Sequence, residues 1–351
     1  MIKEKIIENV GIIYLDRPKI INSLNLEMVK DIEKILKKWE NDDNIKAILF
    51  DSLCQKGFCA GGDLKTIYND YLLNDNCQNK DEFYEEEFIL DKYVKDYKKP
   101  IISHYFGIVM GGGIGLTINS DFIVCDESVN WAMPETRLGF VPDVGVCKHI
   151  SKLPQALGQY LGLCGESLES SDLIKYNLAN LYLDSNNYQK LLDILIELSK
   201  EYEKEELIEN LKIKTEKLKL ENKPSKIDKD MGKIEKYFSY DSFDKILENL
   251  EANKEDEFAQ KTLENLKERY IFMLQVQFEK YFICKNLSKD QVFDLDLNIL
   301  KYARKTGSMK EGIRSLIIDK ESANWKEKSL DQVSLLKVKD LLGIEKLYNE
   351  R

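Results

Sequence analysis

The sequence is poor in histidine. Only His104 and His149 occur among its 351 residues. This scarcity excludes a histidine-rich metal site and argues against a serine–histidine–aspartate triad. The seven cysteines lack the CxxC spacing of metal sites, so we expect free thiols in a reducing compartment. No apolar run approaches the length that a membrane span requires.

Targeting signals and a basic charge excess are also missing. Residues 1–7 resemble neither a signal peptide nor an Arg-rich transit peptide, so we expect a soluble intracellular protein. The net charge of −10 and the pI near 5.1 argue against nucleic acid or an anionic membrane as partner. Any polyanionic ligand would therefore need a local basic patch.

The common phosphate-loop patterns are absent as well. GxxxxGK[ST] does not occur, and GxGxxG fails because no glycine stands three residues after Gly115. The chain does contain a glycine-rich stretch, residues 109–116, which follows a strand-like apolar run and opens a predicted helix. The first N–H groups of a helix lack internal partners, so this stretch is a candidate anion or oxyanion site. The alternative is that small residues let a helix and a strand pack closely.

A second glycine-bearing loop follows another predicted strand. A hairpin is predicted over residues 4–15, and Asn25 is a plausible N-cap for a helix ending near Glu40. The strand over residues 45–50 then leads into the loop 57–63, where Asp63 could cap a following helix.

The next predicted helix, residues 81–97, carries a carboxylate on its apolar stripe. Glu87 lies four residues after Phe83 and three before Leu90. A carboxylate that faces a core is costly unless a partner satisfies it. Periodicity alone leaves two interpretations open, a rim glutamate that reaches water and a polar wall of a pocket.

Two further acids lie in a loop that follows a pair of predicted strands. Glu135 and Asp143 stand among prolines, glycines and apolar residues. Apolar surroundings raise the pKa of an acid, which suits a general acid or base. The alternatives are that Glu135 pairs with Arg137 and that Asp143 caps a helix that begins near Val146.

Strands, glycine turns and helices alternate through residues 45–185, which predicts an α/β core with parallel pairing. Amphipathic patterns then predict helices over 188–220, 242–285 and 289–318. We place the core in residues 1–205 and a charged helical C-terminal region, packing on that core, in 206–351.

Taken together, these motifs resemble the crotonase (enoyl-CoA hydratase/isomerase) superfamily, and in particular its hydrolase branch. The likeness runs almost from end to end, in one order of motifs. It is carried by residues 15–18, 22–25, 58–63, 110–116, 133–136, 142–145 and 310–314, with Ile318-Asp319-Lys320 and Trp325. The resemblance implies a ββα spiral core that binds acyl-CoA.

The resemblance also implies a role for each candidate residue. Gly62 and Gly112 would form an oxyanion hole for the thioester carbonyl. Glu135 would drive cleavage of the thioester, and Asp143 would bind the acyl hydroxyl and help to manage the proton. Glu87 would contact the substrate. The hydratases carry a second glutamate in the glycine helix, at the position that is Gly115 here.

With these residues, the resemblance implies hydrolysis of a short 3-hydroxyacyl-CoA, and the expected substrate is 3-hydroxyisobutyryl-CoA in valine catabolism. CoA is part of the substrate, and no cofactor or metal is expected. The alternatives are an enoyl-CoA hydratase or isomerase and a non-catalytic, hydrolase-like subunit of a large assembly. Acyl preference, the choice between an anhydride and a general-base mechanism, and the oligomeric state stay open, a homo-oligomer included.

The resemblance implies the mitochondrial matrix, whereas the missing transit peptide favours the cytoplasm. Lys56 and Lys65 flank the first glycine loop and are candidates for contacts with the CoA phosphates, although solvated lysines are common in this chain. Three departures from the family pattern bear on acyl preference rather than on the chemistry. They are Trp131, residues 146–148 and residues 267–270.

Overall fold

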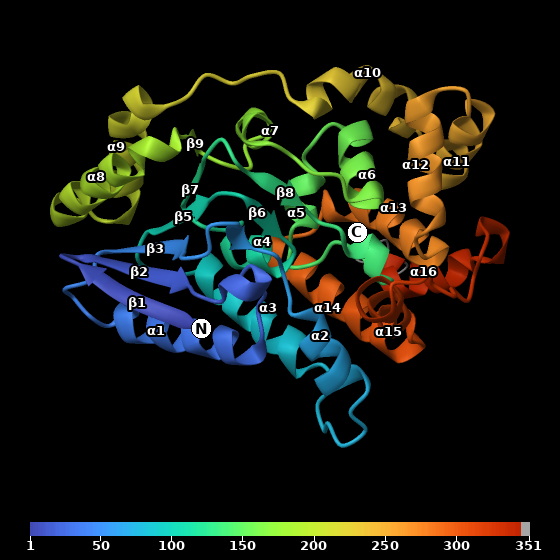
Figure 1. Cartoon of the computed structure of the whole chain (residues 1–351), viewed down its shortest axis with the longest axis horizontal. Helices are drawn as coiled ribbons and strands as arrows, with labels where there is room; N and C mark the ends of the chain where they lie inside the picture. Colours follow the sequence, from blue (N-terminus) through green and yellow to red (C-terminus); the bar gives the residue numbers. More distant parts are fainter. Residues whose placement is uncertain (345–351) are drawn as a thin grey trace. The chain divides into compact units, whose positions relative to one another are not determined.

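A computed structural model describes residues 1–344 (Figure 1). Its contacts divide the chain into two compact units, each assembled from separate segments of the sequence. Unit 1 comprises Met1–Asp63, Glu82–Trp131 and Leu168–Asp228, and unit 2 comprises Leu64–Asp81, Ala132–Ser167 and the chain from Lys229 onward. The predicted domains, residues 1–205 and 206–351, stay a prediction.

Unit 1 is built on a six-stranded sheet in the order β1-β2-β3-β5-β7-β9. The predicted hairpin is confirmed, because β1 and β2 pair antiparallel, and the remaining neighbours pair in parallel as the alternating pattern predicts. The strands are β1 (Ile2–Ile7), β2 (Val10–Leu15), β3 (Ala47–Ser52), β5 (Ile101–Tyr105), β7 (Phe122–Cys125) and β9 (Leu181–Tyr182).

Helices cover both faces of this sheet (Figure 1). On one face the Trp39 ring lies so close to β2 that a Cβ on Gly11 would be 2.6 Å from it. On the other, leucines of α8 and α9 pack on Val10, Ile12 and Leu49 in one apolar cluster. The helices of unit 1 are α1 (Leu26–Glu40), α3 (Glu82–Lys95), α4 (Gly112–Thr117), α7 (Ser170–Lys175), α8 (Tyr188–Glu201) and α9 (Lys204–Thr215).

Helix α1 begins as its sequence predicts, because the Asn25 side chain accepts a hydrogen bond of 3.0 Å from the Met28 amide. The predicted helical segment 188–220 is divided into two α-helices, α8 and α9, and a short 3-10 turn, residues 216–218. Tyr202 is extended, and the chain reverses between α8 and α9. This break lets Leu207 and Leu211 join the same apolar cluster as the leucines of α8.

Unit 2 is helical, and its centre is the almost fully buried α13. Helix α6 can approach α13 closely because Gly158 of α6 lacks a side chain. A Cβ there would be 2.3 Å from the Tyr281 ring. The helices of unit 2 are α2 (Leu64–Thr66), α5 (Cys147–Ile150), α6 (Gln155–Cys164), α11 (Phe243–Ala252), α12 (Glu257–Lys267), α13 (Ile271–Cys284), α14 (Lys289–Thr306), α15 (Ser308–Ile313) and α16 (Leu335–Leu342); the boundary between the units falls within α10 (Lys226–Phe238).

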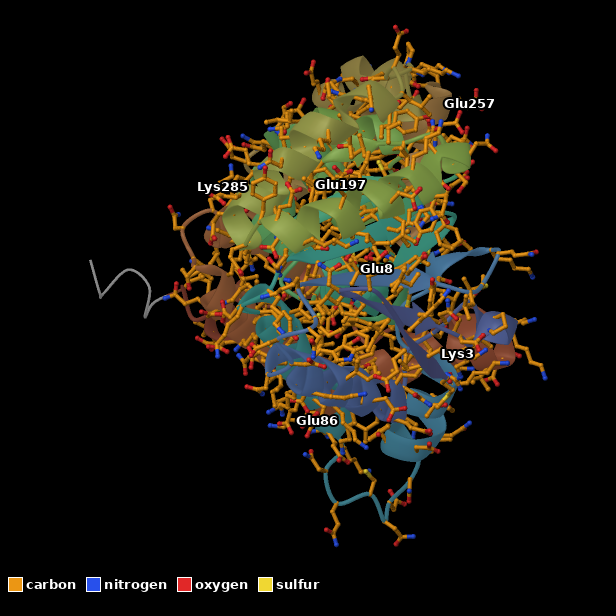
Figure 2. The ribbon with its side chains drawn as sticks, turned by 90° about the vertical axis from the view of Figure 1, so that its left-hand side faces the viewer. Lys3, Glu8, Glu86, Glu197, Glu257 and Lys285 are labelled. Carbon is orange, nitrogen blue, oxygen red and sulfur yellow. The ribbon has the colours of Figure 1, made fainter. Side chains whose placement is uncertain are left out.

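Charged side chains cover the outer faces of these elements. Lys3, Glu8 and Glu197 are exposed, and Figure 2 labels all three. Glu197 is followed directly by the buried Leu198, so the charge pattern of α8 marks its solvated face. Across residues 1–344, no helix combines the length and the apolar composition that a membrane crossing would need.

Candidate active site

The two glycine turns of the sequence lie side by side in unit 1. A small three-stranded sheet, in the order β4-β6-β8, contains β4 (Gly57–Cys59), β6 (Ile108–Met110) and β8 (Asn130–Ala132). Because β4 and β6 pair in parallel, the turns that follow them leave the same edge. A Cβ on Gly61 would be 3.3 Å from the Met110 carbonyl oxygen and 3.6 Å from the Gly112 nitrogen. Gly61 itself has a φ of 94°, a conformation that favours glycine.

A backbone bridge from Leu24 holds the first of these turns in place. The Leu24 amide donates to the Gly61 carbonyl at 2.8 Å, and the Asp63 amide donates to the Leu24 carbonyl at 2.7 Å. Gly62 is therefore fixed between two hydrogen bonds that its neighbours make. Within residues 1–344, the hydrogen bonds described for these turns leave the amides of Gly62 and Gly112 without an acceptor.

The fully buried side chain of Asn22 supports the same turn from behind. Its amide group donates to Ser52 Oγ at 2.7 Å and to the Phe58 carbonyl at 2.8 Å, while its carbonyl oxygen accepts from the Arg17 amide at 2.7 Å. Asn22 has a φ of 55°, which asparagine tolerates better than most residues. One side chain thus ties three segments of unit 1 together.

The glycines of α4 have two different neighbours. At Gly113 a Cβ would be 2.5 Å from Cys59 Cβ, so close packing of helix and strand, the alternative interpretation, holds there. At Gly112 a Cβ would be 2.1 Å from Glu87 Oε1. The missing side chain of Gly112 therefore leaves room for a carboxylate rather than for an apolar core.

Glu87 lies inside unit 1 and does not escape to water. The residue is only 3% exposed, which excludes the rim interpretation that its helical position left open. Burial raises the pKa of the Cys59 thiol to about 12, and the Glu87 charge acts in the same direction. Unit 1 thus brings together Gly62, Gly112 and Glu87, three of the predicted site residues.

The remaining two predicted site residues lie in unit 2. Glu135 begins a short 3-10 helix, η3 (Glu135–Leu138), and is 5% exposed. Its neighbour Thr136 accepts a hydrogen bond of 3.0 Å from Arg269 Nε and donates one of 3.1 Å to the Leu163 carbonyl. These bonds fix the turn that carries Glu135.

Asp143 is also buried, with 5% exposure, in the loop before α5. Burial raises the pKa of its carboxyl group from 3.8 to about 7, and the nearby charge of Asp296 adds to the rise while Lys280 opposes it. A carboxyl group with a pKa near neutrality can exchange protons at physiological pH. The sequence-based expectation of a raised pKa in this loop therefore agrees with the structure.

The structure bears on the structural alternatives for these acids. The ion-pair partner of Arg137 is Glu268, with 3.7 Å between Nη2 and Oε2. Helix α5 has no side-chain cap at its start, where the Val146 amide donates to the main-chain oxygen of Asp143 at 3.0 Å. Asp143 is therefore not a side-chain cap of α5.

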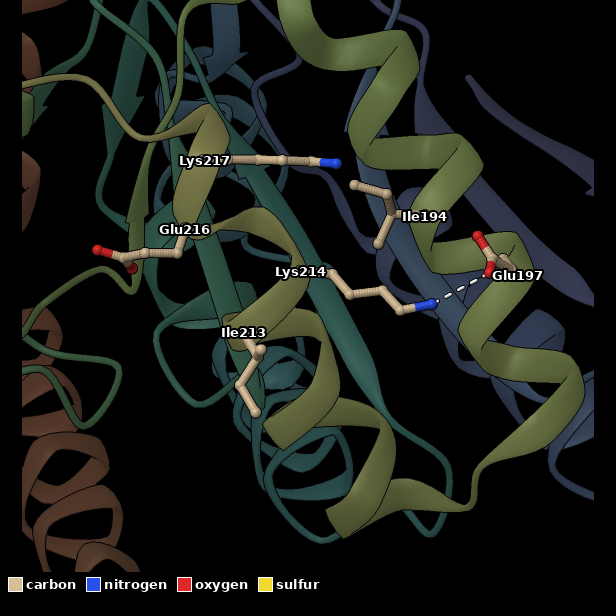
Figure 3. A pocket seen from close by; sticks show the side chains of 6 residues that line it. All are labelled: Ile194, Glu197, Ile213, Lys214, Glu216 and Lys217. Atoms are coloured by element: carbon tan, nitrogen blue, oxygen red, sulfur yellow. Dashed lines mark hydrogen bonds and ion pairs between the residues drawn. The ribbon is translucent and has the colours of Figure 1, made fainter.

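Two pockets have no predicted site residue in their lining. In unit 1, a pocket of about 630 Å³ between α8 and α9 contains the ion pair of Lys214 and Glu197, 3.0 Å apart (Figure 3). In unit 2, a pocket of about 660 Å³ is lined by residues that include Arg137, Arg269 and Trp325. The candidate lysines Lys56 and Lys65 are exposed, and their contact with CoA stays a prediction.

Comparison with known proteins gives the same family over nearly the whole chain. The profile described as "Enoyl-CoA hydratase/isomerase" matches residues 10–342. The chain belongs to this family. It is 32% identical over 326 residues to "3-hydroxyisobutyryl-CoA hydrolase, mitochondrial" of Xenopus laevis, covering 92% of this chain and 84% of that protein. The human protein of the same name is 31% identical over 328 residues, covering 92% and 83%.

Solved structures agree with this family assignment. A "Carnitinyl-CoA dehydratase from Mycobacterium thermoresistibile" matches with a TM-score of 0.85 and 26% identity, covering 97% of this chain and 96% of that one. An "enoyl-CoA hydratase from Rhodobacter sphaeroides 2.4.1" has the same TM-score and coverage at 24% identity, which shows the shared fold. The predicted crotonase-like α/β fold with a helical C-terminal region is thereby confirmed.

Three buried polar residues of unit 2 were not predicted from the sequence of this family member. Arg269 lies in the segment 267–270 that departs from the family pattern, and it anchors Thr136. Lys280 lies among the buried residues of α13, and Asp296 lies on the buried face of α14. A lysine flanked by Phe278, Tyr281 and other large apolar residues was the signal available in the sequence.

Proposed function

We propose that this chain is a CoA-thioester hydrolase that acts on short 3-hydroxyacyl-CoA, with 3-hydroxyisobutyryl-CoA as its preferred substrate. The supporting observation is the pair of buried acids, Glu135 and Asp143, in a chain that has Gly115 where hydratases carry a second glutamate. The names of the curated relatives support the same substrate. Those relatives match over 92% of this chain.

In this proposal the thioester oxygen accepts hydrogen bonds from the amides of Gly62 and Gly112. Negative charge grows on that oxygen as the carbonyl carbon becomes tetrahedral, so donors fixed in advance stabilise the transition state more than the substrate. Loss of one such donor typically costs about 3 kcal/mol. The bridge through Leu24 is what keeps the Gly62 turn rigid.

Glu135 either attacks the carbonyl carbon, giving a mixed anhydride that water then hydrolyses, or removes a proton from the attacking water. Both routes use one water and release a carboxylic acid and the CoA thiol. Asp143 accepts a hydrogen bond from the acyl hydroxyl group or, when protonated, supplies a proton to the departing sulfur. Glu87 contacts the substrate beside Gly112. No step requires a metal or a further cofactor.

Release of free CoA from 3-hydroxyisobutyryl-CoA, followed with a thiol reagent, tests this proposal. We expect Glu135→Gln to lower turnover by at least about 100-fold, the usual contribution of a positioned acid or base. Six of the seven cysteines are buried, and only Cys77 is partly exposed, so the protein's own reaction with the reagent should be small. Turnover that is unchanged in Glu135→Gln refutes the assignment.

The matched control is Glu268→Gln, which changes an exposed glutamate of the same unit and should leave turnover near that of the wild type. Hydration is the second candidate, because the solved dehydratase and hydratase share the fold. That activity would change the absorbance of an enoyl-CoA without releasing a thiol. The same panel of acyl-CoA substrates therefore separates the two candidates.

A further inference from the structure

Unit 2 contains an ion pair with no access to solvent. Lys280 of α13 and Asp296 of α14 have side-chain exposures of 0% and 0%, and 2.5 Å separates Nζ from Oδ1. Moving two charges out of water costs more than their attraction usually returns, so a buried pair is a poor device for stability alone. Its place in the fold suggests a different use.

The pair holds the main chain on both sides of Asp143. Lys280 Nζ donates to the carbonyl oxygen of Pro142, which directly precedes Asp143. Asp296 Oδ2 accepts a hydrogen bond of 2.9 Å from the Gly145 amide, two residues after Asp143. Helices α13 and α14 therefore bind the main chain on the two sides of Asp143 through one connected set of polar contacts.

The loop that carries Asp143 has a strained backbone. Val144 has a φ of 50°, which is rare for a β-branched residue, and Gly145 follows with a φ of 75°. A Cβ on Gly145 would be 2.8 Å from the Phe293 ring of α14, so the loop also lies directly on that helix. A strained backbone conformation persists only where the surrounding structure fixes it. Here the contacts of the ion pair fix the loop.

The charges of Lys280 and Asp296 also affect the ionisation of Asp143. Asp296 disfavours the ionised form of Asp143, and Lys280 favours it, so the two charges act in opposite directions on its pKa. Two hydrogen-bonded thiols, Cys147 of α5 and Cys284 of α13, are further titratable groups on which the charges of Lys280 and Asp296 act. Lys148 lies at the outer end of this region, where Nζ donates to the Cys284 carbonyl at 3.2 Å and to the Lys285 carbonyl at 3.1 Å.

We propose that Lys280 and Asp296 are positioning residues, which fix the Asp143 loop and set the pH at which the Asp143 carboxyl group gains or loses its proton. The inference deepens the proposed function, because it assigns to two helical residues the control of the Asp143 proton. Only the predicted effect on turnover rests on the proposed function. The structural part concerns Asp143 alone and can be tested without a substrate.

Opposite charges give the proposal a distinctive signature. Asp296→Asn removes the negative charge and leaves Lys280, so Asp143 should ionise more easily and titrate at lower pH. Lys280→Met removes the positive charge and leaves Asp296, so Asp143 should titrate at higher pH. A residue that only fills space would shift both variants in the same direction or not at all.

The experiment is an infrared titration of the Asp143 carboxyl group, isolated as the difference between each protein and the same protein with Asp143→Asn. We expect the midpoint to move down in Asp296→Asn and up in Lys280→Met, each by about one pH unit or more. Midpoints that stay within a few tenths of the wild-type value, or that move together, overturn the proposal. This readout does not depend on thiol release, so it separates failure of the inference from failure of the proposed function.

Removal of one partner can prevent folding, so a double variant keeps the test decisive. Lys280→Met/Asp296→Leu leaves no unpaired buried charge, and such replacements are often tolerated. We expect a folded protein whose kcat for thiol release falls about 10-fold or more while KM changes little, because the loop loses both anchors. An unchanged kcat in this folded double variant contradicts the positioning role.

Asp81→Asn provides the matched control. Asp81 pairs with Arg304, also on α14, with 2.5 Å between Oδ1 and Nε. Its loss should lower the thermal stability without moving the Asp143 midpoint. A midpoint that moves equally in Asp81→Asn would show that general loosening of α14, rather than the Lys280–Asp296 pair, controls the proton.

Discussion

The carboxylate of Glu87 occupies the space that a side chain on residue 112 would need. A Cβ on Gly112 would lie 2.1 Å from Glu87 Oε1, far inside van der Waals contact. Because Glu87 is 3% exposed, it has little freedom to retreat. A glycine is therefore required at this position by a polar neighbour rather than by its own backbone conformation.

Gly112→Ala should therefore impair both folding and activity. We expect thiol release to fall about 100-fold, as when an oxyanion donor is displaced, and the melting temperature to fall as Glu87 is pushed aside. Thermal unfolding and the thiol assay measure the two effects. Combining the change with Glu87→Ala should restore the melting temperature, and no restoration would show that Glu87 is not the obstacle.

Gly232→Ala is the control for that prediction. Gly232 lies within α10, and a Cβ there would meet nothing within 4 Å. Alanine is favoured over glycine inside a helix by about 1 kcal/mol. This substitution should therefore leave activity unchanged and raise the free energy of unfolding slightly.

Asn22→Ala should destabilise unit 1 more than most polar substitutions do. It removes the bonds to Ser52, Phe58 and Arg17 and leaves buried groups without partners, a loss of about 2 kcal/mol or more. Urea unfolding measures the change. Asn41→Ala, at the exposed end of α1, should cost at most about 0.5 kcal/mol. Equal effects of the two substitutions would contradict the role assigned to Asn22.

Asp143→Asn should reduce discrimination in favour of hydroxylated acyl groups. A hydrogen bond to a charged group contributes about 1.5–3 kcal/mol, which corresponds to a preference of about 10–100-fold. The ratio of kcat/KM for a 3-hydroxyacyl-CoA to that for the matching acyl-CoA should therefore fall toward one. A ratio that survives the substitution would place recognition of the hydroxyl group elsewhere.

The raised pKa of Asp143 predicts a pH dependence of stability. Between about pH 4 and 7 the folded protein retains a proton that the unfolded chain has released. The contribution of this group is therefore fully present below about pH 4, and it is lost as the pH rises through about 7, with a slope of up to about 1.4 kcal/mol per pH unit. Asp143→Asn should remove this slope, which urea unfolding at several pH values will measure. Parallel curves for the two proteins would contradict the raised pKa.

Local sequence signals predicted the elements whose partners are close in the chain. The hairpin of β1 and β2, the Asn25 cap of α1 and the α3 region follow from periodicity and capping alone. The break between α8 and α9 was missed. Its cause is the packing of Leu207 and Leu211 into a cluster with strands more than 150 residues earlier in the sequence, such as β2 and β3.

For the candidate site too, the sequence predicted some features and the fold decided others. Motif order identified Gly62, Gly112, Glu87, Glu135 and Asp143, although their catalytic roles stay predictions. Helical periodicity could not decide whether Glu87 reaches water, because that depends on which residue lies opposite it. Only the fold places Gly112 there. Lys280 and Asp296 were not recognised in the sequence for the same reason.

The sequence by itself determined the family, the alternation of strands and helices, and the types of residue available for chemistry. These properties depend on composition, on periodicity and on the order of short motifs. The tertiary structure alone decided which charges are buried and which groups they meet, as with Asp143 between Lys280 and Asp296. Burial and electrostatic coupling act through space, and residues 137 positions apart, such as 143 and 280, become neighbours only after the chain has folded.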